Sequence, residues 1–260
     1  MGAQLGWVYI PGVADTQPCI VLHTFPAAMG LPLSESPPCA KVEVYLVLTG
    51  TPFEEVVGDT RKSPTKLVPY VRWPNGELQA ESGEIIARLE ETIGLDAGID
   101  PERLARGREL AALAEEIVYD AILHDRFITP EGARLQRPLT EALVRHFVPG
   151  FLAPLAAIYV DYTQRRRAMR TRMVDPELGY AAAFDVIAQI VGLLGDDPFL
   201  CGEEPCTVDC SIWPLVVHAG ATPNRTPLRD VLRTYPTLVE WVVRFGERLG
   251  RPIEPRQFHA

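Results

Sequence analysis

The sequence predicts a small α/β domain followed by an all-helical domain. Runs rich in β-branched and apolar residues, which are typical of strands, occur only in the first part of the chain; they cover residues 19–23, 52–57 and 70–80. From Pro101 onward the apolar residues recur at the spacing of helix faces instead. A short linker rich in glycine and aspartate, residues 94–100, separates the two patterns.

These patterns divide the chain into three parts. We expect an N-terminal extension at residues 1–18, a first domain at residues 19–93 and the all-α domain at residues 101–260. The extension has neither a charged start nor a long apolar core, so it is not typical of a signal peptide.

The composition is that of a globular protein without a general affinity for polyanions. Hydrophobic residues make up 47% and charged residues 23% of the 260 residues, and the net charge is −9. This charge argues against a nucleic-acid partner and against a general attraction to anionic membranes. No apolar run approaches the roughly 18 residues that a membrane span needs.

The cysteines indicate a reducing environment. The chain has five, at positions 19, 39, 201, 206 and 210. An odd number without a secretory signal argues against a disulfide framework and favours the cytoplasm. No Cys-x-x-Cys pair or histidine completes a zinc pattern around Cys201, so we predict buried thiols and no metal site.

The first domain should have thioredoxin-like order. A strand at 19–23 leads through a long loop to a helix that begins near Ser36 and ends at Gly50, and a second strand follows at 52–57. Such a strand–helix–strand unit forms a right-handed parallel crossover. The hairpin and helix of residues 66–90 then complete a β-α-β-β-β-α order.

That stretch, residues 66–90, carries the strongest local signals. Pro69 stands within an apolar run and cannot donate a ladder hydrogen bond, so we place it at the first position of a strand, where a cis peptide bond would be a specified feature. Pro74-Asn75-Gly76 predicts a tight turn. Glu81 and Ser82 then precede a helix whose apolar face includes Ile85, Ile86 and Leu89.

The second domain shows several helical segments. We expect a first helix from Pro101 to about Phe127, ended at Thr129–Gly132, and a helical region interrupted at Pro149-Gly150. The expected ranges beyond the first helix are 139–173, 180–194, 207–217, 228–233 and 237–249.

The order proline, strand, turn, strand and acid–serine pair resembles the glutathione-binding half of the glutathione transferase superfamily. The resemblance implies a thioredoxin-like N-terminal domain and an all-α C-terminal domain, with glutathione as co-substrate. It also implies that Val68, before the cis Pro69, offers its backbone to the cysteinyl part of glutathione. Glu81 and Ser82 hold the γ-glutamyl end, where a helix N-terminus suits a carboxylate. The plainer alternative is a hairpin and a capped helix without a ligand.

A second signature strengthens the resemblance. Residues 197–209, DPFLCGEEPCTVD, are similar to the family's Phe-Leu-x-Gly-x-x-Pro-Ser/Thr-x-x-Asp helix entry. In that entry a hydroxyl and an aspartate cap the helix reciprocally. Cys206 stands at the hydroxyl position and is a poor capping residue, so we expect a box that is weakened or shifted to Thr207.

Within the superfamily the chain resembles the failed-axon-connections and metaxin-like branch and its bacterial relatives. Shared features are Ser-Pro-x-Cys at 36–39, the Val-Glu-Val-Tyr-Leu helix at 42–46, Gly-Asp-Thr-Arg-Lys at 58–62 and Lys-x-x-Pro-Tyr at 66–70. The arginine-rich segment 165–172 is also similar. The histidine motif that usually follows is absent, and Val174-Asp175-Pro176 stands in its place.

The resemblance implies thiol chemistry near Ser36. Its hydroxyl is expected to donate to the glutathione sulfur, whereas Cys39, one turn further on, is the alternative nucleophile; a plain helix cap is the third possibility for Ser36. The long loop before it leaves Ser34 and Thr24 as further hydroxyl candidates. Lys66 is either a partner of the glycine carboxylate or a solvated surface lysine.

Three functions fit these features. The first is a cytoplasmic glutathione transferase, expected as a homodimer, that conjugates glutathione to a small hydrophobic electrophile. The second is a non-catalytic protein with the same fold that acts in protein–protein contacts, and the third is a glutathione-dependent isomerase or lyase. Tyr119 and His124 lie on the helix that faces the electrophile pocket in the family. The arginine run is either a solvated helix face or a patch for an acidic substrate.

Overall fold

A mixed four-stranded sheet forms the centre of the first domain. The computed structural model describes residues 19–259, so the predicted N-terminal extension lies outside the described residues. The elements of this domain are β1 (Ile20–Thr24), α1 (Pro37–Leu48), β2 (Phe53–Val57), β3 (Tyr70–Arg72), β4 (Leu78–Ala80) and α2 (Ser82–Ile93). The strand order is β2-β1-β3-β4, with β1 and β2 parallel and the other pairs antiparallel. This confirms the thioredoxin-like fold class.

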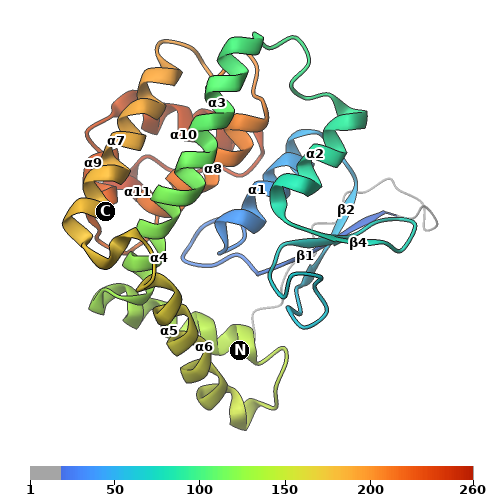
Figure 1. Cartoon of the computed structure of the whole chain (residues 1–260), viewed down its shortest axis with the longest axis vertical. Helices are drawn as coiled ribbons and strands as arrows, with labels where there is room; N and C mark the ends of the chain where they lie inside the picture. The colour runs from blue at the N-terminus through green and yellow to red at the C-terminus, as the bar shows by residue number, and fades with distance from the viewer. Residues whose placement is uncertain (1–18, 260) are drawn as a thin grey trace.

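The core of this domain lies between the sheet and its two helices. Leu22 of the central strand pairs with Glu55 on one side and Val71 on the other, and both Leu22 and Val71 are fully buried. Tyr45 of α1 and Ile85 of α2 are equally buried against this layer. Helix α1 packs against α2 and also against α8 of the second domain (Figure 1).

Every helix or strand of the second domain within the described residues is a helix. Its segments are α3 (Pro101–Leu113), the π-helical η1 (Ala114–Val118), α4 (Tyr119–Phe127), α5 (Pro130–Val144), η2 (Gly150–Leu152), α6 (Ala153–Ala168), η3 (Arg172–Val174), α7 (Pro176–Leu194), α8 (Thr207–Gly220), α9 (Pro227–Leu232), α10 (Pro236–Arg248) and α11 (Arg256–His259). Helices α3, η1 and α4 run on as the single long helix that was predicted up to Phe127.

Two predicted helix starts are wrong, and the first is that of α5. Helix α5 begins at Pro130 and not near Leu139, because the Oγ1 atom of Thr129 accepts a hydrogen bond from the backbone N–H of Gly132 at 3.2 Å. Thr129 and Pro130 therefore end one helix and begin the next. Pro138 lies within α5.

Helix α7 is long and apolar enough to cross a membrane by length and composition alone. It starts earlier than predicted, at Pro176, because Asp175 caps it by accepting from the N–H of Leu178 at 3.3 Å. In the structure its residues Val186, Ile187 and Ile190 are buried in the main core, so α7 is a packed core helix.

The capping box at the start of α8 is neither shifted nor lost. Cys206 occupies the N-cap position, and the Asp209 carboxylate accepts from its backbone N–H at 3.0 Å. Asp209 also accepts from the N–H of Leu200 and from the indole of Trp241. The box therefore depends mainly on the aspartate, which explains why a poor capping residue is tolerated at position 206.

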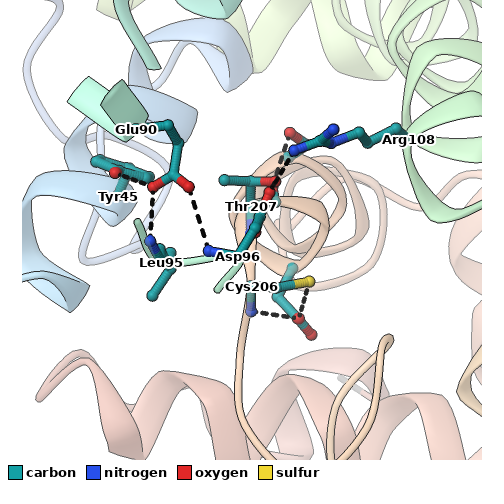
Figure 2. A network of polar contacts seen from close by, with 9 residues as sticks. Tyr45, Glu90, Leu95, Asp96, Arg108, Cys206 and Thr207 are labelled. Atoms are coloured by element: carbon teal, nitrogen blue, oxygen red, sulfur yellow. Dashed lines mark hydrogen bonds and ion pairs between the residues drawn. The ribbon is translucent and has the colours of Figure 1, made fainter. Parts of the chain in front are cut away.

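A polar network joins the interdomain linker to both domains (Figure 2). The Glu90 carboxylate of α2 accepts from Tyr45 and from the backbone N–H groups of Leu95 and Asp96. The Asp96 carboxylate in turn accepts from the backbone N–H and the hydroxyl of Thr207, at 2.8 and 2.6 Å. Thr207 is thus engaged by the linker instead of capping its own helix.

Candidate functional site

A cavity of about 250 Å³ lies between the two domains. The first domain contributes Ser36, Pro37, Pro38, Lys41, Thr65, Leu67, Val68, Pro69, Glu81 and Ser82, and the second contributes Glu115, Tyr119, Arg167, Ser211 and Leu215. Seven residues were predicted to act on the thiol or to bind glutathione, apart from the alternative hydroxyls of Ser34 and Thr24, and five of the seven line this one cavity. The two that do not are Cys39 and Lys66.

Ser36 occupies the N-cap position of α1 with an extended backbone (φ −100°). Its hydroxyl makes no capping hydrogen bond, so the interpretation of Ser36 as a plain helix cap does not describe this side chain. The alternative hydroxyls of Ser34 and Thr24 are buried and are not part of the cavity wall. Ser36 is therefore the candidate hydroxyl that faces the cavity at the start of α1.

Cys39 lies one turn into α1 and is fully buried. Burial raises the pKa of its thiol, although the nearby hydroxyls of Ser36, Thr24 and Ser34 oppose the shift. A buried thiol with a raised pKa stays protonated at neutral pH and is a poor nucleophile. Its position thus disfavours Cys39 as the reactive group.

The turn before β3 and the start of α2 form the facing wall. The peptide bond between Val68 and Pro69 is cis, as predicted. Glu81 has φ 68° and ψ 112°, a conformation that non-glycine residues rarely adopt and that tends to occur at functional sites. Helix α2 begins at Ser82 without any side-chain cap, which leaves its first N–H groups available to an anion.

Two cations, Lys41 and Arg167, line the cavity, whereas Lys66 does not. Lys41 carried no signal in the sequence, and Arg167 belongs to the arginine run considered above as a patch for an acidic substrate. The Lys66 ammonium donates to the backbone carbonyl of Arg61 at 2.9 Å, consistent with a surface lysine. Lys41 of α1 pairs with Glu115 of η1, with 2.6 Å between Nζ and Oε1, so this ion pair crosses from one domain to the other. Arg167 reaches the cavity from the end of α6.

Tyr119 follows directly after the π-helical segment η1. Its side chain lines the cavity, and burial raises the pKa of its hydroxyl, which therefore stays protonated at neutral pH. Segments of π-helix are frequent at functional sites, and here η1 also presents Glu115 to the cavity. His124, the other predicted residue on this helix, instead lies 3.2 Å from the Tyr180 hydroxyl and is not in the wall.

The loop that delivers Ser36 is held by buried side chains of the second domain. The Arg126 guanidinium donates to the carbonyl of Glu35 at 2.6 Å and to Nδ1 of His218 at 2.7 Å. Nε2 of His218 donates to the carbonyl of Ser34 at 3.0 Å. Because Nδ1 accepts while Nε2 donates, His218 is held as the neutral tautomer.

This arrangement predicts a pH dependence of stability. Burial and the nearby Arg126 hold the pKa of His218 well below its usual range. Below about pH 6.5 the unfolded chain therefore binds a proton that the native chain does not, and the free energy of unfolding should fall by up to about 1.4 kcal/mol per pH unit. Denaturant titrations at several pH values below about 6.5 measure the free energy of unfolding, which should fall less steeply with falling pH in His218→Gln than in the parent. The exposed His146→Gln serves as the control. The same pH dependence of the unfolding free energy in the parent and both variants would contradict the prediction.

Comparison with known proteins shows the family to which this chain belongs. Residues 37–132 match the family description "Glutathione S-transferase N-terminal domain", and residues 183–245 match "Glutathione S-transferase, C-terminal domain". Together the two segments cover more than half of the chain. The chain belongs to the glutathione S-transferase family.

Individual relatives agree with this assignment. The chain is 26% identical over 239 residues to isoprene-epoxide–glutathione S-transferase of Rhodococcus sp. strain AD45, covering 88% of this chain and 98% of that protein. It is also 26% identical over 242 residues to Failed axon connections of Drosophila melanogaster, covering 88% of this chain but only 57% of that protein.

Solved structures share the fold. A glutathione S-transferase from Methylobacterium radiotolerans, in complex with glutathione sulfonate, superposes with a TM-score of 0.57 at 20% identity, covering 90% of this chain and 94% of that one. The β-etherase LigF from Sphingobium sp. strain SYK-6 gives a TM-score of 0.58 at 16% identity, covering 92% and 98%. At these identities the likeness concerns the fold alone.

Proposed function

We propose that this protein is a glutathione transferase that joins the glutathione thiolate to a small hydrophobic electrophile. The observation that carries the proposal is the convergence of Ser36, Val68, Glu81 and Ser82 on one interdomain cavity. These residues come from three separate segments of the chain, and the helical domain supplies the remaining wall. A protein without a ligand has no need for this convergence.

In this proposal the first domain holds the tripeptide. The Val68 backbone pairs with the cysteinyl unit, and the Glu81 carboxylate accepts from the γ-glutamyl ammonium. The γ-glutamyl carboxylate accepts hydrogen bonds from the Ser82 hydroxyl and from the uncapped N–H groups of α2. The helix dipole favours an anion at that position. Rare backbone geometry at Glu81 supports a role in binding, because such conformations persist mainly where function requires them.

Ser36 acts on the sulfur. A free thiol titrates near ~8.5, so rapid attack at neutral pH needs stabilisation of the thiolate. A hydroxyl that donates to the sulfur, at the N-terminus of α1, favours the anion. The thiol releases its proton to solvent, and the thiolate lone pair forms the new C–S bond. The bond from that carbon to the leaving group or ring oxygen breaks at the same time, and its electron pair stays on the leaving group or oxygen.

The electrophile lies against the helical domain. Leu67, Pro37 and Leu215 supply apolar wall, and the protonated Tyr119 hydroxyl supplies a hydrogen-bond donor. An epoxide fits this combination, because ring opening leaves an alkoxide oxygen that needs a proton. The name of the Rhodococcus relative makes epoxides the first electrophiles to assay.

Glu81→Ala should weaken glutathione binding by about 10- to 100-fold, the loss of one charge-assisted hydrogen bond of roughly 1.5–3 kcal/mol. Retention on immobilised glutathione, followed by elution with free glutathione, tests both the function and this residue. Glu84→Ala is a matched control, since it removes another exposed carboxylate from the first turn of the same helix.

The test distinguishes failure of the proposed function from failure of the role assigned to Glu81. Failure of the unmutated protein to bind glutathione or to conjugate any electrophile would favour the non-catalytic alternative. Normal binding with equal losses in Glu81→Ala and Glu84→Ala would contradict only the assignment of Glu81. The homodimer and the cytoplasmic location stay predictions.

A further inference from the structure

Helix α6 and the turn before it carry a continuous exposed apolar stripe. Its six residues lie one, three, four or seven positions apart and are 54–82% exposed; they are Phe151, Leu155, Ile158, Tyr159, Tyr162 and Met169, named here the α6 stripe. That spacing places them along one side of a helix. Contiguous exposed apolar surface of this kind usually marks an interaction site.

The opposite side of α6 packs against the neighbouring helix α5. Ala153 and Ala157 are fully buried with Val144 of α5 in a small cluster separate from the main core. Arg137 of α5 pairs with Asp161 of α6 at 2.8 Å. Figure 1 shows the α5–α6 pair extending away from the rest of the helical domain. The inner side thus packs against α5, while the α6 stripe faces outward.

The charge of this region is opposite to that of the whole chain. Residues 145–172 contain six arginines, one aspartate and no lysine or glutamate, a net charge of +5 in a chain of net charge −9. Arg165, Arg166 and Arg170 are exposed, and within the described residues none of them forms an ion pair. The Arg166 guanidinium lies 5.8 Å from the ring centroid of Tyr162, so cationic and apolar groups meet on one surface.

We propose that the α6 stripe and these three arginines form a binding surface for an anionic lipid bilayer. An interfacial helix places aromatic and aliphatic residues among the lipid chains while arginines meet the anionic headgroups. The chain's overall negative charge then limits adsorption elsewhere and orients α6 toward the lipid. Arg167 of the same helix lines the cavity, so the proposed surface lies close to the candidate site.

The charge argues against a second copy of the chain as the occupant. A two-fold contact through the α6 stripe would place the same patch of both subunits face to face. Each subunit would then bring a segment of net charge +5 against its equal. Mutual repulsion disfavours that contact, whereas an anionic membrane is attracted by the same charges.

Co-sedimentation of the full chain with vesicles tests the proposal. We expect binding to vesicles of equal parts phosphatidylcholine and phosphatidylglycerol, weaker binding in higher salt, and little binding to phosphatidylcholine alone. The double variant Arg165→Ala/Arg166→Ala should lower the partition coefficient roughly 25-fold, about fivefold for each arginine. Ile158→Ser/Tyr159→Ser should also reduce binding by tenfold or more.

Two controls make the outcome decisive. Arg233→Ala/Arg248→Ala removes two exposed arginines elsewhere and should leave vesicle binding unchanged. Thermal unfolding checks that each variant is folded. No sedimentation with anionic vesicles, or equal binding by the stripe variants and the parent, would overturn the proposal. A parent that is dimeric, fails to bind vesicles and becomes monomeric in Ile158→Ser/Tyr159→Ser would identify a second copy as the occupant instead.

Discussion

We expect Ser36→Ala to slow glutathione conjugation by about 10- to 100-fold while glutathione binding changes little. The variant removes one hydrogen bond to an anionic sulfur, worth roughly 1.5–3 kcal/mol, and that difference enters the rate directly. The tripeptide keeps its proposed contacts with Val68, Glu81 and Ser82. Without the donor, the pKa of the bound thiol rises, so the pH–rate profile should move to higher pH and the loss should shrink in alkaline buffer.

The measurement is a conjugation assay against pH with a general aromatic electrophile. Cys39→Ala is the matched variant, because Cys39 lies one turn away, is buried and is not part of the cavity wall. Its effect on rate should be mild. An unchanged pH profile for Ser36→Ala, together with an inactive Cys39→Ala, would reject the assignment and move the chemistry to the cysteine.

Arg126→Met should lower the free energy of unfolding by about 3–5 kcal/mol, the largest stability effect that we expect. Methionine fills similar space but donates nothing to the Glu35 carbonyl or to His218. Both acceptors would stay buried without their partner, and Glu35 would lose its neighbouring positive charge. Because Glu35 directly precedes Ser36, the same change should also slow conjugation by those molecules of the variant that remain folded.

Urea unfolding of Arg126→Met and of Arg106→Met measures this difference. Arg106 is exposed on α3, so its replacement should change stability by no more than about 0.5 kcal/mol. Similar stabilities for the two variants would show that the Arg126 contacts are not the anchor of the loop.

Much of the fold was predictable because its signals are local. The proline at position 69, the turn at 74–76 and the acid–serine pair at 81–82 each act within a few residues, and together they specify the hairpin and α2. The arrangement of the whole sheet then followed from the order of the elements. Pro130 was misread because a proline that ends one helix and a proline that begins the next look alike without the Thr129 cap.

The rest of the site depends on contacts between distant residues. Lys41 and Glu115 are 74 positions apart, and Arg126 meets a loop residue 91 positions away. No periodicity or spacing in the sequence predicts such pairs. Arg167 shows the same difficulty, since the sequence contains a run of arginines and only the fold decides which of them reaches the cavity.

The net charge of the whole chain likewise concealed the positive charge of one segment. A net charge of −9 argued against a general attraction to anionic membranes, yet residues 145–172 carry +5. The helical spacing of the exposed apolar residues in α6 could have been found in the sequence. Their outward orientation could not have been predicted from the sequence, because an apolar stripe on a helix normally packs inward.

The linker network has a consequence for exchanging domains between relatives. Glu90 binds the backbone of Leu95 and Asp96, while Asp96 binds Thr207 and pairs with Arg108 at 2.7 Å. The linker therefore works as a shared part of both domains. A chimera joined at this linker would lose these hydrogen bonds unless Glu90, Asp96 and Thr207 are all kept. Recombination at the domain boundary would therefore still disrupt the contacts that connect the two domains.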